Sequence, residues 1–340
     1  MQGWKGLWCH GRRHPIETAI SLIVICLILW ALWATGSWVV QAADWSVVGS
    51  NLPLYLSGSY PEDERWRPVT WVSLLAMLTL LTLLRPGRGA RVRWLELCLP
   101  WGWIAMIPLG LGLLGGGVAL NAVPSRDWGG LSLSLLLTAC SAALALPLGM
   151  LLALGRTSDL PVIRHSSRLY IDLMRAVPLI AVLFFGQLLI PLFLPVELEI
   201  NRVLRAVVAF ALFAAAYVAE DVRGGLQTIP ATQTEAAAAL GLTPIQSLRL
   251  VVLPQALRIA VPALTNQAIG LLQNTSLMAL LGLVELLGIG RSLLANPAFI
   301  GRHLEVYVWL GSLYWLFCTA MALLARRIER DSPPLGGHTA

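Results

Sequence analysis

The sequence predicts an all-α polytopic membrane protein with about eight transmembrane helices. Of its 340 residues, 57% are hydrophobic and only 12% are charged, whereas soluble domains carry roughly 25% charged residues. Uncharged apolar stretches of about 20 residues recur along the chain, and this is the length that a helix needs to cross the hydrocarbon core of a bilayer. These two observations exclude a soluble globular domain.

Eight apolar stretches are candidate spans, with boundaries that are good to a few residues. They lie at residues 18–40, 69–84, 95–118, 129–154, 177–194, 203–222, 258–284 and 305–325. The first span follows a basic start and ends at Val40-Gln41-Ala42, which resembles a signal-peptide cleavage pattern. However, its uncharged part from Thr18 to Val40 exceeds the about 7–15 residues of a signal peptide's apolar region. We therefore expect a retained anchor.

The basic residues orient these spans. If the N-terminus is cytoplasmic, most of the arginines fall in cytoplasmic segments, so the positive-inside rule places both termini in the cytoplasm. The net charge of +6 then suits an anionic membrane surface. Nucleic acid is not an expected partner, because no basic run exceeds two adjacent residues.

The organisation of the chain changes near residue 128. Three spans, an external loop and most of the tryptophans precede this point, and five spans with longer cytoplasmic connections follow it. We interpret residues 1–127 as an accessory transmembrane region and residues 128–330 as the working core. The tail at 331–340, DSPPLGGHTA, has little apolar content and contains Pro and Gly, which predicts a disordered cytoplasmic segment.

Several kinds of site are excluded by their missing residues. A Walker A ATP site needs a lysine within its glycine-rich loop, and the only lysine is Lys5, outside any such motif. The five cysteines and five histidines are scattered and form no metal-binding spacing. No G-x-S-x-G or H-E-x-x-H hydrolase motif is present. The chain is therefore not expected to be an enzyme, and we expect no metal site and no cofactor of its own.

Two further motifs are interpreted structurally. GLGLLG at 110–115 matches the dinucleotide fingerprint, but it lies inside an uncharged span without the required strand, so close helix packing is the better interpretation. An ion-coupled carrier would need buried carboxylates within its spans. Glu96, Glu220, Asp221 and Glu285 instead lie at or near the predicted span ends.

Residues 231–254 predict two short helices joined by one sharp corner. Thr232 and Glu235 form the pattern of a capping box, and the alanines after them favour a helix that ends where Gly241 can adopt a left-handed conformation. Thr243 before Pro244 predicts the start of a second helix, which ends at Pro254. From the residues alone, an amphipathic connector at the membrane interface explains this segment equally well.

The same segment resembles a known family signature. Glu235-Ala236-Ala237, then Gly241, Val251 and Leu253-Pro254 match the EAA motif of bacterial ABC importer permeases, in which isoleucine stands at the position of Val251. The flanking sequences at 217–230 and 254–277 are similar to that family. Segment 152–184 resembles the first core span and elbow of the polar amino-acid permeases. Segment 295–318 and the additional N-terminal spans are most similar to the longer M-type subunit of the general L-amino-acid importer. The resemblance covers about residues 128–330.

This resemblance implies a fold, a mechanism and partners. The fold would be a type I ABC importer core of five helices, preceded by three additional spans, in the bacterial inner membrane. The corner would be a coupling helix that docks into a groove on a dimer of ATPase subunits, which bind the ATP and Mg²⁺. A second permease subunit, an external solute-binding protein and membrane lipid complete the expected partners. The implied coupling residues are Glu235, Ala236, Ala237, Gly241, Leu242, Thr243, Pro244, Ile245, Leu248, Leu253 and Pro254.

The chain departs from the family pattern at two places. Ala231-Thr232 stands where Lys-Gly is usual, and Gln273 replaces the lysine of the family's KDTSL or KNTSL, which leaves charge selectivity open. Gln273, Asn274, Thr275 and Ser276 either line the substrate path or make polar contacts between helices. Arg175 is expected to anchor its helix at the membrane interface.

The predicted function is that of a permease subunit for L-amino acids. The alternative is a permease for another polar solute, or a non-transporting assembly or regulatory subunit.

Overall fold

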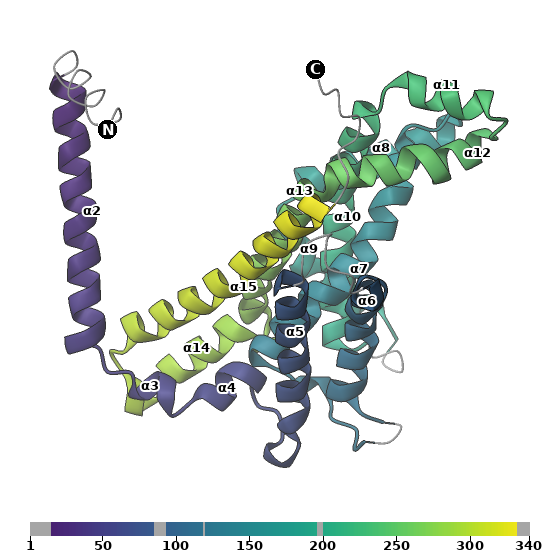
Figure 1. Ribbon diagram of the computed structural model, residues 1–340. Coiled ribbons are helices and arrows are strands. Elements are labelled where there is room, and N and C mark those ends of the chain that lie inside the picture. The colour runs from purple at the N-terminus through teal and green to yellow at the C-terminus, as the bar shows by residue number, and fades with distance from the viewer. Residues whose placement is uncertain (1–14, 85–92, 118–119, 196–199, 332–340) are drawn as a thin grey trace. The chain divides into compact units, whose positions relative to one another are not determined.

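The computed structural model describes residues 15–84, 93–117, 120–195 and 200–331. These residues form helices with short connections, and apart from one isolated bridge between Gly130 and Glu285 they contain no strand (Figure 1). The predicted all-α fold is therefore confirmed. The chain divides into two compact units, residues 1–50 and residues 51–340, and each is described by itself.

The first unit contains α2 (Pro15–Gln41) and the short α3 (Ser46–Gly49). α2 corresponds to the predicted anchor at 18–40, and its large apolar side chains, such as Ile20, Trp30 and Trp33, are exposed. These side chains point to all sides of the helix, which is typical of a helix surrounded by lipid.

The second unit contains all the remaining helices. The α-helices are α4 (Leu52–Ser57), α5 (Trp66–Leu84), α6 (Arg93–Gly115), α7 (Gly130–Arg156), α8 (Pro161–Ala176), α9 (Leu179–Phe184), α10 (Arg202–Thr228), α11 (Ala231–Ala239), α12 (Pro244–Ser247), α13 (Leu253–Asn274), α14 (Leu286–Leu294) and α15 (His303–Asp331). The 3₁₀ segments are η1 (Glu62–Glu64), η2 (Ser125–Asp127), η4 (Ile190–Phe193), η6 (Thr275–Leu281) and η7 (Pro297–Phe299), and the π-helical segments are η3 (Phe185–Leu189) and η5 (Leu248–Val252).

Seven described helical segments are long and apolar enough to cross a membrane, or eight if one bent pair counts as a span. They are Ile16–Gln41, Glu62–Leu84, Cys98–Gly115, Gly130–Arg156, Arg202–Thr228, Pro244–Leu281 and His303–Arg330. This agrees with the predicted multi-pass protein of about eight spans.

The predicted span at 177–194 differs from expectation. It corresponds to Leu179–Phe193, which is shorter than the about 20 residues of a straight span and follows α8 after a bend of 103°. The bend occurs at Val177 and Pro178, whose backbones are extended. The cause is local, because a residue that precedes proline is pushed out of the helical conformation.

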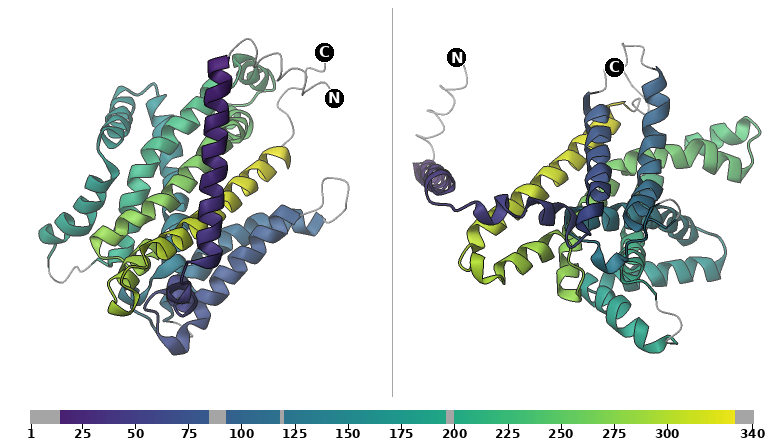
Figure 2. Two further views of the ribbon diagram at one scale, coloured as in Figure 1. Left: turned by 90° about the vertical axis from the view of Figure 1, so that its left-hand side faces the viewer. Right: turned by 90° about the horizontal axis from the view of Figure 1, so that it is seen from below.

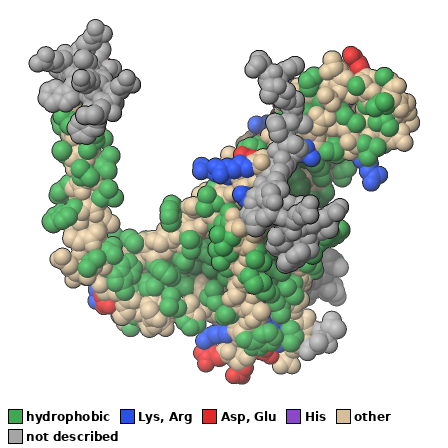
Figure 3. All heavy atoms as spheres, viewed as in Figure 1, with side chains coloured by type: hydrophobic (Ala, Val, Ile, Leu, Met, Phe, Trp, Pro, Cys, Tyr) green, Lys and Arg blue, Asp and Glu red, His purple; other side chains and the backbone are tan. Residues whose placement is uncertain are grey.

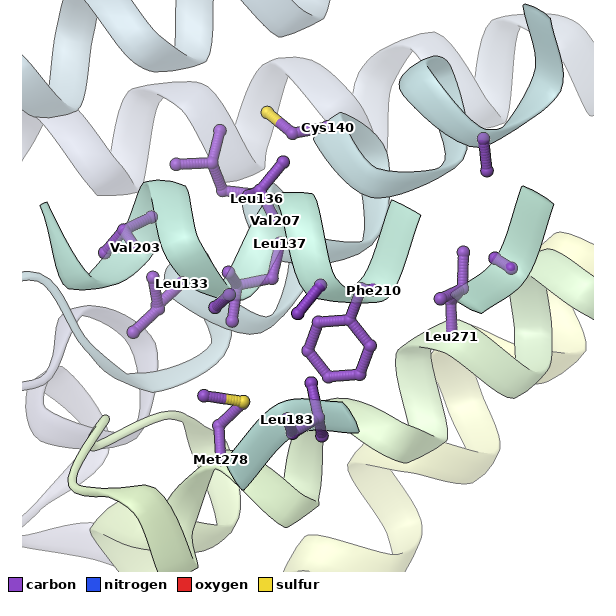
Figure 4. Close-up of a cluster of buried hydrophobic side chains, with 14 of the residues drawn as sticks. Leu133, Leu136, Leu137, Cys140, Leu183, Val203, Val207, Phe210, Leu271 and Met278 are labelled. Carbon is purple, nitrogen blue, oxygen red and sulfur yellow. The ribbon is translucent and has the colours of Figure 1, made fainter. Parts of the chain in front are cut away.

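The core of the second unit lies between α7 and α10. Leu133, Leu136 and Leu137 of α7 face Val207 and Phe210 of α10, and all of them are buried. Figure 4 shows Leu183, Leu271 and Met278 closing the same cluster from α9, α13 and η6. α10 is thus the central helix, and it leads directly into the predicted corner.

Within the second unit, α4, α5 and α6 pack onto this core. α5 lies against α6 and α15, and α4 lies against α7 and α14. Trp71 of α5 donates a hydrogen bond to the Met106 carbonyl at 2.9 Å. Arg67 is buried, pairs with Glu64 at 2.8 Å and donates to the Asn121 carbonyl at 2.7 Å. A functional division at residues 127/128 stays a prediction.

Some sequence-based expectations concern residues outside the described ranges. These are the tail beyond Asp331 and the basic residues Lys5, Arg12, Arg13, Arg85, Arg88 and Arg91.

Candidate functional site

The corner at residues 240–243 lies at the end of a projection formed by α11, α12 and the start of α13. The projection extends away from the remaining helices of its unit in Figure 1 and in the right view of Figure 2. α10 leads into it and α13 leads back out of it. Any force applied to the corner therefore reaches two helices that continue into the core.

The first helix of the projection begins earlier than its predicted cap. Pro230 occupies the N-cap position of α11 with an extended backbone, and no side chain caps this end. The predicted capping box of Thr232 and Glu235 is therefore wrong. Ile229 precedes a proline and is extended, so α10 ends there and the next helix starts at Ala231, one residue before Thr232.

The corner itself matches the prediction. Gly241 has a φ of +79°, the left-handed conformation that L side chains rarely adopt. The Gly241 N–H donates to the Ala238 carbonyl at 2.9 Å, and the Leu242 N–H donates to the Ala237 carbonyl at 3.2 Å. These two bonds form a Schellman motif, which satisfies carbonyl groups at the C-terminus of a helix.

The second helix starts with a complete capping box. The Gln246 N–H donates to the Thr243 hydroxyl oxygen at 3.3 Å, and the Thr243 N–H donates to the Gln246 side-chain oxygen at 2.9 Å. Pro244 occupies the first helical turn. The start at Thr243-Pro244 is confirmed, and the reciprocal partner Gln246 was missed. The pattern Thr-x-x-Gln signals it.

The second helix does not end at Pro254 as predicted. α12, η5, α13 and η6 form one helical segment that runs from Pro244 to Leu281. The π-helical turn of η5 ends at Val252, so Pro254 falls in the first turn of α13. Proline lacks an N–H group and cannot bond to the preceding turn, and the π-helical turn of η5 lies where that bond is missing. The corner is thus directly continuous with a candidate membrane span.

The two arms of the projection contact one another. Ala237 of α11 and Ser247 of α12 are buried. The Gln255 side chain donates to the Gln233 side-chain oxygen at 3.2 Å and to the Val251 carbonyl at 2.9 Å. The two arms of the projection are therefore held together by buried side chains and by a hydrogen bond between α11 and α13.

The tip of this element presents apolar side chains. Leu240 is 82% exposed, Ile245 is 77% exposed and Leu250 is 62% exposed, and hydrophobic side chains are visible at this end in Figure 3. These three side chains are exposed on an element whose backbone is fixed by its caps. Such side chains can fill a groove on another protein.

The remaining predicted coupling residues surround the corner. Glu235, Ala236, Thr243 and Pro244 are exposed, whereas Leu242, Leu248 and Leu253 are partly buried, and Pro254 is exposed.

The base of the projection is a close helix contact. A Cβ atom at Gly225 of α10 would lie 2.4 Å from the Ala256 carbonyl oxygen of α13. The neighbouring Gly224 has no atom within 4 Å of its Cβ position. α10 and α13 therefore touch backbone to backbone at Gly225, which small residues allow.

A network of arginines lies near the base. Glu220 of α10 accepts from Arg156 at 2.7 Å and from Arg223 at 2.8 Å, and it pairs with Arg175 at 3.4 Å. The Arg175 guanidinium also lies over the Tyr217 ring, with 5.6 Å to the ring centroid. One carboxylate thus joins the C-terminal ends of α7 and α8 to α10. Sequence reasoning treated these residues separately and missed their grouping.

The predicted path residues do not all face the same space. Gln273 and Ser276 line a cavity of about 340 Å³ together with Leu287, Tyr307, Leu310, Gly311 and Tyr314. Thr275 is buried and donates to the Leu272 carbonyl at 2.7 Å, and Asn274 is partly buried. The structure therefore brings two of the four predicted residues to one cavity.

Comparison with known proteins identifies the family. Residues 145–332 match the family described as "Binding-protein-dependent transport system inner membrane component". The chain belongs to this family. It is therefore a permease subunit, a multi-pass inner-membrane protein that works with an ATPase and a solute-binding protein.

Individual relatives of this permease have amino-acid transport in their descriptions. It is 38% identical over 292 residues to the "Inner membrane amino-acid ABC transporter permease protein YhdY" of Escherichia coli K12, covering 85% of this chain and 77% of that one. It is 30% identical over 399 residues to the "Glutamate/glutamine/aspartate/asparagine transport system permease protein BztC" of Rhodobacter capsulatus, covering 93% and 92%.

A solved structure described as an amino acid ABC transporter with histidines has a similar fold. Its TM-score is 0.53 at 27% identity, and the match covers 59% of this permease and 92% of that chain.

One acidic residue of the permease lies near a span end, as expected, but it is buried. Glu285 follows the last turn of its span, but it is 0% exposed. It caps α14, accepting from the N–H groups of Leu287 and Gly288 at 2.9 Å each, and it also accepts from the hydroxyls of Tyr314 at 3.2 Å and Ser134 at 3.3 Å. Sequence alone gave no signal of this burial.

Proposed function

We propose that this permease carries L-amino acids and that its corner at Leu240–Ile245 docks into a groove of the ATPase. The capped, rigid corner with the exposed Leu240 and Ile245, and with the exposed Leu250 in the following η5, carries the docking proposal. The printed descriptions of the relatives above support the substrate class.

In this proposal ATP and Mg²⁺ are bound by the ATPase dimer alone. Nucleotide binding closes that dimer and draws the docked corners of two permease subunits together. The second docked corner comes from a second permease subunit, which we propose to be a paralogue of this chain. Since α10 and α13 both continue from the projection into the core, movement of the corner reorients the spans that line the path.

The proposed orientation follows from this assignment. The ATPase is cytoplasmic, so the corner and the ends of α10 and α13 next to it are cytoplasmic. Arg249 of η5 lies near the corner, and Arg223 and Arg258 lie near the base of the projection, in agreement with the positive-inside rule. Both termini are then cytoplasmic, residues 1–127 are an accessory region around the core at 128–330, and lipid covers the exposed apolar faces.

A matched pair of substitutions tests the docking. Ile245 is 77% exposed at the corner, and Ile300 is 74% exposed in the connection before α15. Burying an isoleucine side chain contributes about 1.5–3 kcal/mol, so Ile245→Ser should weaken ATPase association at least tenfold. Ile300→Ser should leave it unchanged, because the position lies outside the docking surface.

The readout is the amount of ATPase that co-purifies with a tagged permease, followed by binding-protein-dependent uptake of labelled amino acids into vesicles. Equal recovery of the ATPase with both variants would refute docking at this corner. Uptake of no amino acid by the intact complex would refute the substrate class.

A further inference from the structure

α8 (Pro161–Ala176) has a position and a surface that the docking corner does not explain. It follows the end of α7 and is bent by 103° relative to the apolar segment Leu179–Phe193 that comes after it. Where that segment enters the bilayer, α8 lies along the membrane surface rather than across the membrane. α8 is also on the same side of its unit as the corner (Figure 1).

One side of α8 is fixed to the core. Ser167 and Ile171, which are one turn apart, are buried, and Gly155 of α7 leaves no room for a Cβ atom beside Ser167. The Tyr170 hydroxyl donates to the Leu212 carbonyl of α10 at 2.7 Å. These contacts fix the rotation of α8 about its own axis, and they therefore determine which of its residues face outward.

The outward surface of α8 is apolar on one side. Val162 is 77% exposed, Leu169 is 70% exposed and Leu173 is 54% exposed. At about 100° per residue these three positions lie within about 40° of one another. An apolar side of this kind, next to a charged side, is typical of a helix that rests in the membrane interface.

Arginines occupy another side of α8. Arg164, Arg168 and Arg175 lie within about 40° of one another, and the centre of this side is about 140° from the centre of the apolar side. The Arg175 guanidinium is held by the core, since it pairs with Glu220 at 3.4 Å and lies over the Tyr217 ring. Arg164 and Arg168 are therefore the two arginines that α8 presents outward.

The charge of these two arginines is not neutralised within the described part of the chain. Arg168 is 66% exposed and pairs with Asp172 at 3.6 Å, but Asp172 also pairs with Arg156 at 3.5 Å. No carboxylate among the described residues pairs with Arg164, which is exposed. One shared carboxylate thus faces two outward guanidinium groups.

Two exposed guanidinium groups one turn apart suit phosphate groups, because the planar fork of arginine matches phosphate oxygens. Lipid phosphates lie at the depth where an interfacial helix rests, and an anionic lipid adds the net negative charge that attracts basic residues. We propose that Arg164 and Arg168 bind the headgroups of anionic phospholipids in the leaflet on the side of the corner. Val162, Leu169 and Leu173 then lie among the acyl chains. This binding goes beyond the transport function and depends neither on the amino acid carried nor on the ATPase.

The test measures which lipid lies next to α8. A photoreactive amino acid replaces Leu169 in the full-length chain, and the complex of both permeases and the ATPase is placed in nanodiscs with equal amounts of phosphatidylglycerol and phosphatidylcholine. Mass spectrometry gives the ratio of the two cross-linked lipids. One basic residue near an anionic surface contributes about fivefold to binding, so the wild-type arginines should give at least a fivefold excess of phosphatidylglycerol.

Three comparisons assign the excess to the two arginines. Arg164→Gln with Arg168→Gln should lower it at least fivefold. The matched control, Arg126→Gln with Arg291→Gln, removes the same charge from exposed positions in η2 and α14 and should leave it unchanged. Arg164→Lys with Arg168→Lys keeps the charge and should retain most of the excess.

Salt provides a test that needs no substitution of an arginine. About 1 M salt shortens the Debye length to about 3 Å, so the excess of phosphatidylglycerol should fall with the wild-type arginines in place. This series decides the proposal even where the glutamine variant fails to assemble, which size-exclusion chromatography detects.

Several outcomes would overturn the proposal. They are equal cross-linking of the two lipids with the wild-type arginines, an excess that does not respond to salt, and an excess that survives the loss of both arginines. A glutamine variant that loses only the ATPase while the lipid ratio is unchanged would assign this side of α8 to the ATPase instead. The readout involves no amino acid and no uptake, so a failure of transport counts against the importer function and not against the lipid site.

Discussion

Two adjacent glycines give a stringent test of how the projection is fixed to the core. Gly225→Ala places a Cβ atom 2.4 Å from the Ala256 carbonyl oxygen, whereas Gly224→Ala meets nothing within 4 Å. Backbone cannot rotate out of the way as a side chain can, so α13 must move by about 1 Å to reach an ordinary contact distance. Overpacking of this kind costs about 1–3 kcal/mol.

The comparison of the two variants isolates this cost. Glycine in a helix interior is about 1 kcal/mol less favourable than alanine, and both variants remove a glycine from α10, so this gain is common to them. The free energy of unfolding should therefore be about 1–3 kcal/mol lower for Gly225→Ala than for Gly224→Ala, with the latter at or above wild type.

The assay has two parts. Thermal unfolding of the purified complex should show a melting temperature a few degrees lower for Gly225→Ala than for Gly224→Ala. Uptake per ATP hydrolysed should fall for Gly225→Ala alone, because the displaced α13 changes how corner movement reaches the core. Equal melting temperatures would refute the contact, and a lower temperature with unchanged uptake per ATP would refute its role in coupling.

Three further predictions concern the corner and the arginine network. Gly241→Val should abolish coupled uptake, because it strains a left-handed position by about 1–2 kcal/mol. Gly301→Val, at a φ of +89° outside the corner, should preserve ATPase co-purification. Uptake that survives Gly241→Val would contradict the rigid corner. Thr243→Ala removes a capping group and should lower the melting temperature of the complex, with a cost of about 1 kcal/mol; an unchanged value counts against the box. Glu220→Gln should lower the free energy of unfolding by about 1–3 kcal/mol. Glu62→Gln, in an exposed ion pair, should change it by under about 1 kcal/mol. Equal effects of the two substitutions on chemical denaturation would refute a stabilising role of the arginine network around Glu220.

The corner was predictable because its determinants are local. Gly241 is the residue that a left-handed position favours, and Thr243-Pro244 specifies a helix start within one turn. The error at Thr232 is also local, because Pro230 and the extended Ile229 place the N-cap two residues earlier, at Pro230. Pro254 was predicted to end the second helix, because proline interrupts the backbone hydrogen bonds of a helix. The sequence does not reveal that a π-helical turn precedes this proline and that the helix continues through it.

The cavity was predictable only in part, because helix phase decides which side chains meet. Four consecutive polar residues cannot all face one space when each is turned by about 100° from the last. Gln273 and Ser276 are three residues apart and share a face, whereas Thr275 points into the core. Tyr314 and Glu285 come from elsewhere in the chain, so only the tertiary fold brings them to this place.

The continuity of the helical segment from Pro244 to Leu281 has a mechanical consequence. At 1.5 Å per residue, Ile245 lies about 16 Å along the helix on one side of the Ala256 contact, and Gln273 lies about 25 Å away on the other. If the helical segment pivots about the Ala256 contact, then Ile245, proposed to dock, and Gln273, at the cavity, are the two ends of one rigid helix and move in opposite directions. A displacement of Ile245 by the ATPase then moves Gln273 in the opposite direction by about 1.5 times that distance. No chain of side-chain contacts between the two residues is needed.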